Sequence, residues 1–280
     1  MPSVLITGAA RGIGRAAALR LATLGWDVHA GVRTPADGEE LAGAAPQGRI
    51  TPVLLDVTDA AQVAALDGVL GDRLDAVINN AGVAVTSPVE GLGADELRRQ
   101  LEINVVGPVA VTQAVLPRLR ASGGRVVFIS SVSGRVSAPL TGAYSASKYA
   151  LEALADSLRI ELRPWGVRVT LIEPGAIDTD IWRGALETVD AAEAQLSDEH
   201  RTLYRAHFAG ARGTVKRIQK QAAPVEKVVD AIENALTSAK PRARYVVGAD
   251  ARIQLVLRAA LPTSAMDAAV AKATGTPGSA

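Results

Sequence analysis

Short apolar segments alternate along this chain with longer segments in which apolar residues recur every three or four positions. Several of the short segments are apolar on both faces, which is typical of strands buried between two layers of helices. The predicted strands are 3–7, 27–32, 50–55, 75–79, 125–130, 167–173 and 243–247. The predicted helices are 12–24, 59–70, 94–121, 142–163 and 224–238. This alternation predicts an α/β protein with a doubly wound, seven-stranded, mostly parallel sheet flanked by helices.

Composition narrows the classes of function. The 280 residues suit one large domain with a sizeable core, and the net charge of +1 gives no sign of a nucleic-acid surface. The chain has no cysteine, which excludes disulfides, thiolate chemistry and cysteine-ligated metal. The three histidines, His29, His200 and His207, lack metal-ligand spacing. We therefore expect no metal and no nucleic-acid partner.

The apolar run Val4-Leu5-Ile6 of the first predicted strand begins within three residues of the start, which leaves no room for a signal peptide. No apolar run approaches the roughly 20 residues that span a bilayer. The sequence thus predicts a cytoplasmic protein with no transmembrane segment.

Residues 180–222 interrupt the alternation, because they are helical in pattern but polar. They follow the sixth strand, near the carboxyl edge of the sheet, where folds of this kind bind ligands. We interpret them as a substrate lid, with a plain surface helical hairpin as the alternative. The predicted organisation is a catalytic domain over 1–248, which includes this lid, and a C-terminal helical extension over 249–280.

A glycine-rich turn joins the first strand to the first helix. The strand ends at Thr7, and Gly8, Gly12 and Gly14 follow before an alanine-rich helix. Glycines permit a tight turn and close approach of the backbone, while the helix N-terminus supplies unpaired N–H groups that favour a phosphate. This turn predicts a dinucleotide site in a Rossmann-type fold.

Tyr144 and Lys148 lie four residues apart, so they share one face of a helix. Lowering the pKa of a phenol by about 3 units takes roughly 4 kcal/mol. One ammonium group about 4 Å away supplies a similar energy at an effective dielectric constant near 20. The pair can therefore act as an acid/base, although such pairs are also common on the surfaces of amphipathic helices.

Several motifs occur together in one order along the chain: Gly8-x-x-x-Gly12-x-Gly14, Asn79-Asn80-Ala81-Gly82, Asn104, Ser131, Tyr144-x-x-x-Lys148 and Pro174-Gly175. This series resembles the short-chain dehydrogenase/reductase family, in its compact single-domain branch. The resemblance is close over about 1–180 and looser over 224–247. Through Arg244–Gly248 and the tail that follows, it extends weakly to the steroid- and retinol-dehydrogenase-like members.

The resemblance implies a catalytic set of Asn104, Ser131, Tyr144 and Lys148. Ser131 would hydrogen-bond the substrate oxygen and Tyr144 would exchange a proton. Lys148 would lower the tyrosine pKa and orient the cofactor ribose. Asn104 would bind water through a helix irregularity and complete a proton relay to Lys148. A buried asparagine that satisfies a kinked helix is the alternative for Asn104, and Ser130 and Ser133 are alternatives for Ser131.

The same resemblance implies a nicotinamide dinucleotide site. Its residues would be Gly8, Arg11, Gly12, Ile13, Gly14, Arg33, Asp56, Val57, Asn80, Ala81, Gly82, Tyr144, Lys148, Pro174, Gly175 and Thr179. Structural support of the sheet would also explain Asn80, and an N-cap would also explain Thr179. No carboxylate ends the second strand, whereas Arg33 and Arg11 suit a 2′-phosphate, so we expect NADP(H) rather than NAD(H).

Together these features predict an NADP(H)-dependent oxidoreductase that interconverts a carbonyl and a secondary or primary alcohol on a moderately apolar small molecule. The alternatives are a catalytically silent dinucleotide-binding sensor or scaffold, and an interaction protein that recruits a partner through its tail. Family members commonly pair through the two long helices predicted at 94–121 and 142–163, which implies a homodimer or homotetramer.

An apolar stripe marks the C-terminal extension. It consists of Ile253, Val256, Leu257, Ala260 and Leu261. We expect this stripe to pack on its own domain; a subunit contact and a shallow membrane-surface helix are the alternatives.

Overall fold

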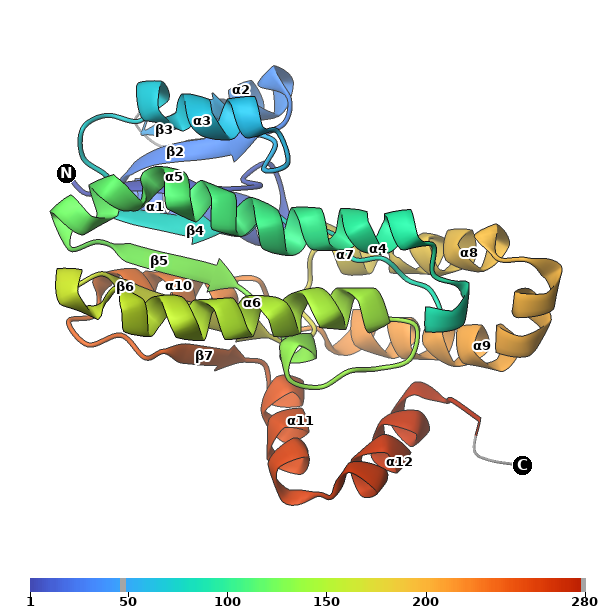
Figure 1. The fold of residues 1–280 in the computed structure, drawn as a ribbon. Helices are drawn as coiled ribbons and strands as arrows, with labels where there is room; N and C mark the ends of the chain where they lie inside the picture. Colours follow the sequence, from blue (N-terminus) through green and yellow to red (C-terminus); the bar gives the residue numbers. More distant parts are fainter. Residues whose placement is uncertain (46–48, 278–280) are drawn as a thin grey trace.

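Seven parallel strands form one sheet in the order β3-β2-β1-β4-β5-β6-β7 (Figure 1). The computed structural model describes residues 1–45 and 49–277. The strands are β1 Ser3–Ile6, β2 Asp27–Val32, β3 Ile50–Leu54, β4 Ala76–Asn79, β5 Arg125–Ile129, β6 Arg168–Pro174 and β7 Arg244–Val247. All seven predicted strands are present, and the predicted fold class is confirmed.

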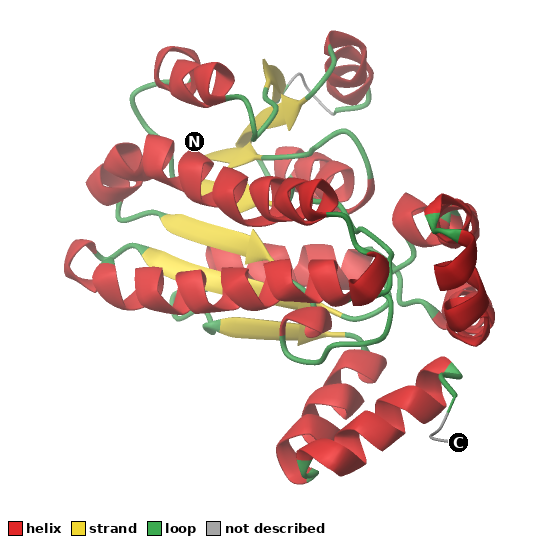
Figure 2. Cartoon of the chain, turned by 45° about the vertical axis from the view of Figure 1, so that its right-hand side comes forward, coloured by secondary structure: helices red, strands yellow, loops and turns green. Residues whose placement is uncertain are grey.

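Two layers of helices cover the sheet (Figures 1 and 2). Apolar side chains of α1, α2 and α10 pack with one side of the strands, and those of α3, α5 and α6 pack with the other. These helices are α1 Gly12–Thr23, α2 Pro35–Gly43, α10 Glu226–Thr237, α3 Ala60–Val69, α5 Gly107–Ser122 and α6 Gly142–Glu161. The short 3₁₀ segments are η2 Val89–Gly91, η4 Val132–Gly134 and η5 Arg163–Trp165. α2 was not among the helices predicted from the sequence, although Thr34 caps it and Pro35 begins it.

The strand order reverses between β1 and β4, because the chain crosses from β3 on one edge back past β1. In open parallel sheets a ligand crevice forms at such a reversal, outside the carboxyl ends of the strands. The candidate site therefore lies where β1, β4, β5 and β6 end.

The predicted helix 94–121 is wrong as a single α-helix. The chain forms α4 Ala94–Leu101, a π-helical turn η3 Glu102–Val106, and only then α5. A Cβ on Gly107 would lie 2.7 Å from Cγ2 of Val57, so this close packing requires glycine at the point where the π-turn ends. The π-turn carries Asn104 and leaves it buried.

Residues 180–222 form three helices beyond the carboxyl ends of the strands (Figure 1). They are α7 Asp180–Arg183, α8 Ala185–Gln195 and α9 Asp198–Gln221. Val189, Leu196, Phe208 and Val215 form a small core of their own. Leu140 from the loop before α6 joins this core, and its φ of 65° is the only positive φ of a non-glycine residue in the part of the chain described.

The C-terminal extension consists of α11 Ala249–Ala260 and α12 Thr263–Thr274, which form a bent pair below the sheet (Figure 2). Residues 278–280 of the predicted extension lie outside the described residues. α12 packs against α9: Gly210 lies so close to the Thr274 carbonyl oxygen that a Cβ would overlap it. Arg217 Nη2 also donates to the Ala273 carbonyl oxygen at 2.7 Å.

The apolar stripe of α11 does not pack on its own domain, so that expectation is wrong. Ile253 and Val256 are 60% and 66% exposed, and Leu257 is also exposed. α11 is instead anchored by Ala251, which is fully buried. Among the described residues, no helix combines the length and apolar character that crossing a bilayer requires.

The separate core of α8 and α9 predicts local rather than global effects of mutation. Phe208→Ala removes a fully buried side chain, and we expect a cost of about 3–5 kcal/mol. Hydrogen exchange should accelerate in α8 and α9 while the strands stay protected. Leu203→Ala, at an exposed position of the same helix, is the control. Equal acceleration throughout the sheet would contradict a separate core.

Candidate active site

Four hydrogen bonds join the ends of β1 and β4. The Thr7 hydroxyl accepts from the backbone N–H groups of Asn80 and Ala81, both at 3.0 Å. In return, Asn80 Nδ2 donates to the carbonyl oxygens of Thr7 and Gly8, also at 3.0 Å. The structural role considered for Asn80 is therefore present, and it fixes the start of the glycine-rich turn.

The turn after β1 has the shape of a phosphate cradle. Gly8 and Gly12 have φ values of +63° and +56°, which other L-residues rarely adopt. A Cβ on Gly14 would overlap the Gly8 carbonyl oxygen, and one on Gly8 would lie 3.0 Å from the Cα of Ala81. The described side chains leave the N-terminus of α1 without a cap, and its first turn contains no acidic residue. Backbone N–H groups there fit a dinucleotide pyrophosphate.

The predicted adenosine residues lie after β2 and β3. Arg33 is exposed just after β2, and it is close enough to Asp56 to help lower the pKa of that carboxyl group. The larger cause of this lowering is the pair of hydrogen bonds that Asp56 accepts from Thr58. Arg11 is exposed at the start of α1, next to the half-buried Ile13. Val57 is buried in the core against Gly107.

Two buried amides, Gln100 near the end of α4 and Asn104 in the π-turn, fix the loop after β4. Asn104 Nδ2 donates to the Val83 carbonyl oxygen at 2.9 Å and to Ser147 Oγ at 3.1 Å, while its Oδ1 accepts from the Val83 N–H. Gln100 donates to the same Val83 carbonyl at 2.8 Å. The Asn104 side chain also limits the space beside Gly82, where a Cβ would be 3.3 Å from Oδ1. The helix irregularity expected at Asn104 is present, and its side chain binds protein groups.

Ser131 follows the end of β5 and links it to β6. Its hydroxyl accepts from the Ser133 N–H at 3.1 Å and donates to the Pro174 carbonyl oxygen at 3.4 Å. Ser131 is also close enough to Tyr144 to act on the pKa of its hydroxyl, which it lowers. Ser130 Oγ is buried and has no hydrogen-bond partner among the described residues. Of the serines considered, Ser131 is therefore the one placed against the tyrosine.

Tyr144 and Lys148 lie on the face of α6 that meets the ends of β5 and β6. Lys148 Nζ is 5.7 Å from the centre of the Tyr144 ring and donates to the Ile129 carbonyl oxygen at 2.7 Å. Burial lowers the pKa of Lys148 to about 8, and the negative charge of Glu152 opposes that change.

The pKa of Tyr144 differs from the expectation. Burial raises it, and the hydrogen bond with Ser131 only partly opposes that rise. The expected lowering by Lys148 is absent here, because the ammonium group points to Ile129 rather than to the phenol oxygen.

The loop after β6 brings the last predicted residues to the site. Thr179 occupies the position just before α7, but its hydroxyl does not cap that helix and donates instead to the Ile177 carbonyl oxygen at 3.3 Å. A Cβ on Gly12 would be 3.8 Å from Thr179, so this threonine faces the glycine-rich turn. Asp250, which was not predicted from the sequence, packs against Gly175 and accepts from the Ala176 N–H at 2.8 Å.

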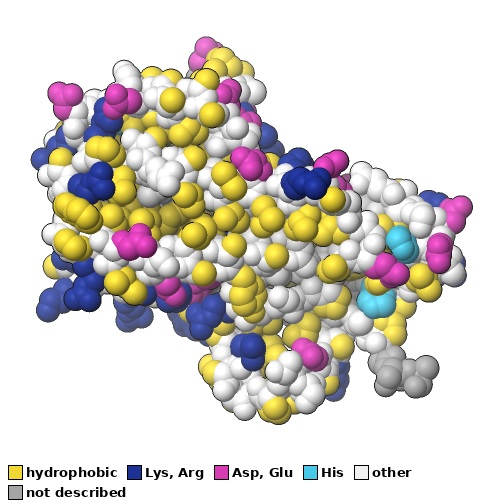
Figure 3. Space-filling model, in the orientation of Figure 1, with side chains coloured by type: hydrophobic (Ala, Val, Ile, Leu, Met, Phe, Trp, Pro, Cys, Tyr) yellow, Lys and Arg dark blue, Asp and Glu magenta, His cyan; other side chains and the backbone are white. Residues whose placement is uncertain are grey.

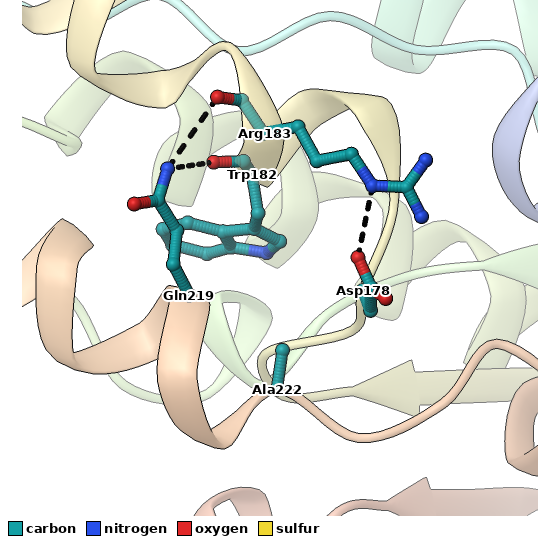
Figure 4. Close-up of a pocket in the computed structure, with 5 residues that line it drawn as sticks. All are labelled: Asp178, Trp182, Arg183, Gln219 and Ala222. Atoms are coloured by element: carbon teal, nitrogen blue, oxygen red, sulfur yellow. Dashed lines mark hydrogen bonds and ion pairs between the residues drawn. The ribbon is translucent and has the colours of Figure 1, made fainter.

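A hollow of about 240 Å³ lies between the start of α7 and the end of α9 (Figure 4). Its lining includes Trp182 and Ala222, together with an ion pair at 3.1 Å between Arg183 and Asp178. Gln219 Nε2 donates to the Trp182 carbonyl oxygen at 2.8 Å and holds the two helices together. No group of three or more His, Asp or Glu side chains that could hold a metal occurs among the described residues.

Residues 2–190 match the model of the short chain dehydrogenase family. The chain belongs to this family. Its members are oxidoreductases that bind a nicotinamide dinucleotide, which agrees with the phosphate cradle after β1 and the tyrosine–lysine pair on α6.

Similar proteins span most of the chain. It is 36% identical to "Retinol dehydrogenase 5" of Mus musculus, over 95% of this chain and 86% of that protein. It is 37% identical to "NADPH-dependent 3-dehydrocapnine reductase" of Ornithobacterium rhinotracheale, over 88% of each. A short chain dehydrogenase from Burkholderia cenocepacia, solved in complex with NADP, superposes with a TM-score of 0.74 at 28% identity, covering 96% of this chain and 97% of that one. The predicted resemblance to retinol-dehydrogenase-like members is confirmed.

The close contact at Gly14 yields a prediction about cofactor binding. Gly14→Ala places a Cβ against the Gly8 carbonyl oxygen and should distort the phosphate cradle. We expect at least a tenfold loss of dinucleotide affinity, or about 1.4 kcal/mol, in a fluorescence titration. Gly43→Ala is the matched control, because nothing lies within 4 Å of a Cβ there. Unchanged binding in Gly14→Ala would refute the assignment of this turn as the cradle.

Proposed function

We propose that this chain is an NADP(H)-dependent oxidoreductase that interconverts a carbonyl and a secondary or primary alcohol on a moderately apolar small molecule. The observation that carries the proposal is the arrangement of Ser131, which follows β5, with Tyr144 and Lys148 on the face of α6 that meets the end of β5, where Lys148 Nζ lies 5.7 Å from the centre of the tyrosine ring. This group lies at the same edge of the sheet as the glycine-rich turn after β1.

Each member of the catalytic set has a distinct role in this proposal. The bound nicotinamide supplies or accepts the hydride. Ser131 donates a hydrogen bond to the substrate oxygen, and Tyr144 transfers a proton to or from it. Burial keeps Tyr144 protonated in the free protein, which is the form that a carbonyl reduction requires of its acid. Lys148 supplies a positive charge beside the phenol and a donor for the cofactor ribose. The π-turn that carries Asn104 binds the water that completes a proton relay to Lys148.

The preference for NADP(H) rests on charge near the adenosine end. Arg33 follows β2 directly, where an acidic residue would repel a 2′-phosphate. The guanidinium groups of Arg33 and Arg11 are exposed and free to form bidentate contacts with phosphate oxygens. The NADP-bound structural neighbour and the NADPH-dependent relative are consistent with this choice. The remaining cofactor residues of the proposal are those predicted from the sequence.

The substrate in this proposal binds between the catalytic edge and α7–α9, which serve as a lid within a catalytic domain over 1–248. Trp182, half-buried against the α8–α9 core, supplies apolar surface on the lid side. The extension over 249–280 braces the lid through the contact of α12 with α9.

We also propose that the protein pairs with itself through α5 and α6. Apolar side chains gather on the face that these helices form (Figure 3). Among them, Leu154 is 42% exposed and Ile160 is 64% exposed. A homodimer or homotetramer would cover this surface.

Removing the Tyr144 hydroxyl tests the chemistry. Tyr144→Phe should reduce turnover by at least about 100-fold, because the proton donor is lost, while NADPH still binds. The measurement is the loss of NADPH absorbance with a panel of ketones, aldehydes, quinones and steroid or retinoid carbonyls. Tyr149→Phe, at the exposed neighbouring position, should keep full activity. Turnover that survives in Tyr144→Phe would rule out this mechanism.

Arg33→Ala tests the cofactor preference. Loss of a charged hydrogen bond of about 1.5–3 kcal/mol should weaken NADPH binding roughly 10- to 100-fold and leave NADH binding unchanged. Fluorescence titration with each nucleotide measures both affinities. Arg252→Ala on α11 removes the same charge far from the cradle and serves as the control. Equal weakening of both nucleotides in Arg33→Ala would count against a 2′-phosphate contact.

A further inference from the structure

Two buried glutamates lie between the catalytic lysine and the edge strand β7. Glu152 follows Lys148 by one turn of α6, and Glu173 is the residue before Pro174 on β6. They are 5% and 0% exposed. Nε of Arg244 on β7 donates to Glu152 Oε2 at 3.0 Å and forms an ion pair with Glu173 Oε1 at 2.9 Å. One guanidinium nitrogen therefore brings the two carboxyl groups together.

The second oxygen of each carboxyl group is also buried. Glu152 Oε1 and Glu173 Oε2 receive no hydrogen bond from any donor among the described residues. Both carboxyl groups lie against Nε of Arg244, so the charge of each acts on the other. Two ionised carboxylates in such contact repel, whereas a single proton between them gives a hydrogen bond. The proton belongs on Glu173, because burial and the charge of Glu152 both raise its pKa.

Other charged groups complete the surroundings of this pair. Asp156 on α6 accepts from Nη2 of Arg244 at 2.8 Å, and Arg159 in turn pairs with Asp156. Arg135, after η4, reaches Glu173 at 3.4 Å. α4 and the π-turn also pack against α6, and the buried polar side chains that they contribute are the neutral amides Gln100 and Asn104. The charged residues there are exposed: Asp95, Glu96, Arg98, Arg99 and Glu102.

We propose that Glu152 and Glu173 share one proton and that the negative charge left on Glu152 holds Lys148 as an ammonium ion. Both glutamates are then positioning residues, since they act on the reaction through Lys148 and touch no reacting atom. Their importance for catalysis rests on the proposed function. The charge arrangement itself is a property of the free protein.

The electrostatics of Lys148 explain why such a pair is needed. Burial works against its positive charge and brings its pKa to about 8, close to neutral pH. Glu152 is the charged group that counteracts this effect. Sharing a proton keeps the pair near a single negative charge, which limits the repulsion that two buried carboxylates would cause.

The direct test is an NMR titration of the lysine side chains in the full-length protein without substrate. The chain has six lysines, so selective labelling at Cε gives few signals, and Lys148→Met identifies the one that matters. We expect Lys148 to titrate near 8 in the unaltered protein. Glu152→Gln should lower that pKa by about one unit. Glu173→Gln, which mimics the protonated acid, should leave it unchanged.

Asp156→Asn is the matched control, because Asp156 binds the same arginine one helical turn farther from Lys148. It should not move the Lys148 titration. An absent shift in Glu152→Gln, or an equal one in Asp156→Asn, would overturn the role of Glu152. Equal shifts in Glu152→Gln and Glu173→Gln would show that both acids are ionised and would overturn the shared proton.

Infrared spectroscopy tests the pair even if a variant does not fold. At neutral pH the unaltered protein should show the carbonyl stretch of a buried protonated carboxyl group. Its absence would overturn the shared proton. Neither measurement depends on turnover. A protein that reduces no carbonyl but shows the Glu152 shift would therefore contradict the proposed function and leave this inference standing.

Discussion

The reciprocal hydrogen bonds between Thr7 and the Asn80-Ala81 segment are the contact on which the site depends. They join the two strands between which the sheet order reverses, so they set the width of the crevice at that edge. The same bonds hold the Gly8 carbonyl oxygen, against which Gly14 packs. A change in the geometry of this junction would therefore shift both the phosphate cradle and the loop after β4, which binds Asn104 of the π-turn.

Much of the architecture could be predicted because its causes are local. Strands such as 125–129 are apolar on both faces, and only a sheet covered on both sides accommodates that pattern. The glycine-rich turn and the Tyr144–Lys148 pair could likewise be recognised in the sequence, because each involves only a few neighbouring residues. Helix α2 was missed because it is only nine residues long and contains Gly38 and Gly43, which weaken the helical pattern.

The features that escaped prediction depend on distant partners. Glu152 looks like a solvent-exposed position of an amphipathic helix until Arg244, 92 residues away, is placed beside it. Glu173 is a charge inside an apolar strand, which signals a buried partner without naming it. The π-turn ends where Gly107 packs on Val57, a contact between distant segments that helical periodicity does not reveal. The lowered pKa expected for Tyr144 also failed, because it depends on where Lys148 points rather than on spacing.

The contact between α9 and α12 ties the helical segment 180–222 to the C-terminal extension. Gly210 has no room for a side chain beside Thr274, and Arg217 binds the Ala273 carbonyl oxygen. Substitutions that change the shape of α9 for a new substrate would disrupt this packing unless α12 changed as well. α9 and α12 therefore behave as one packing unit. Exchanging the lid between relatives would require exchanging the C-terminal extension with it.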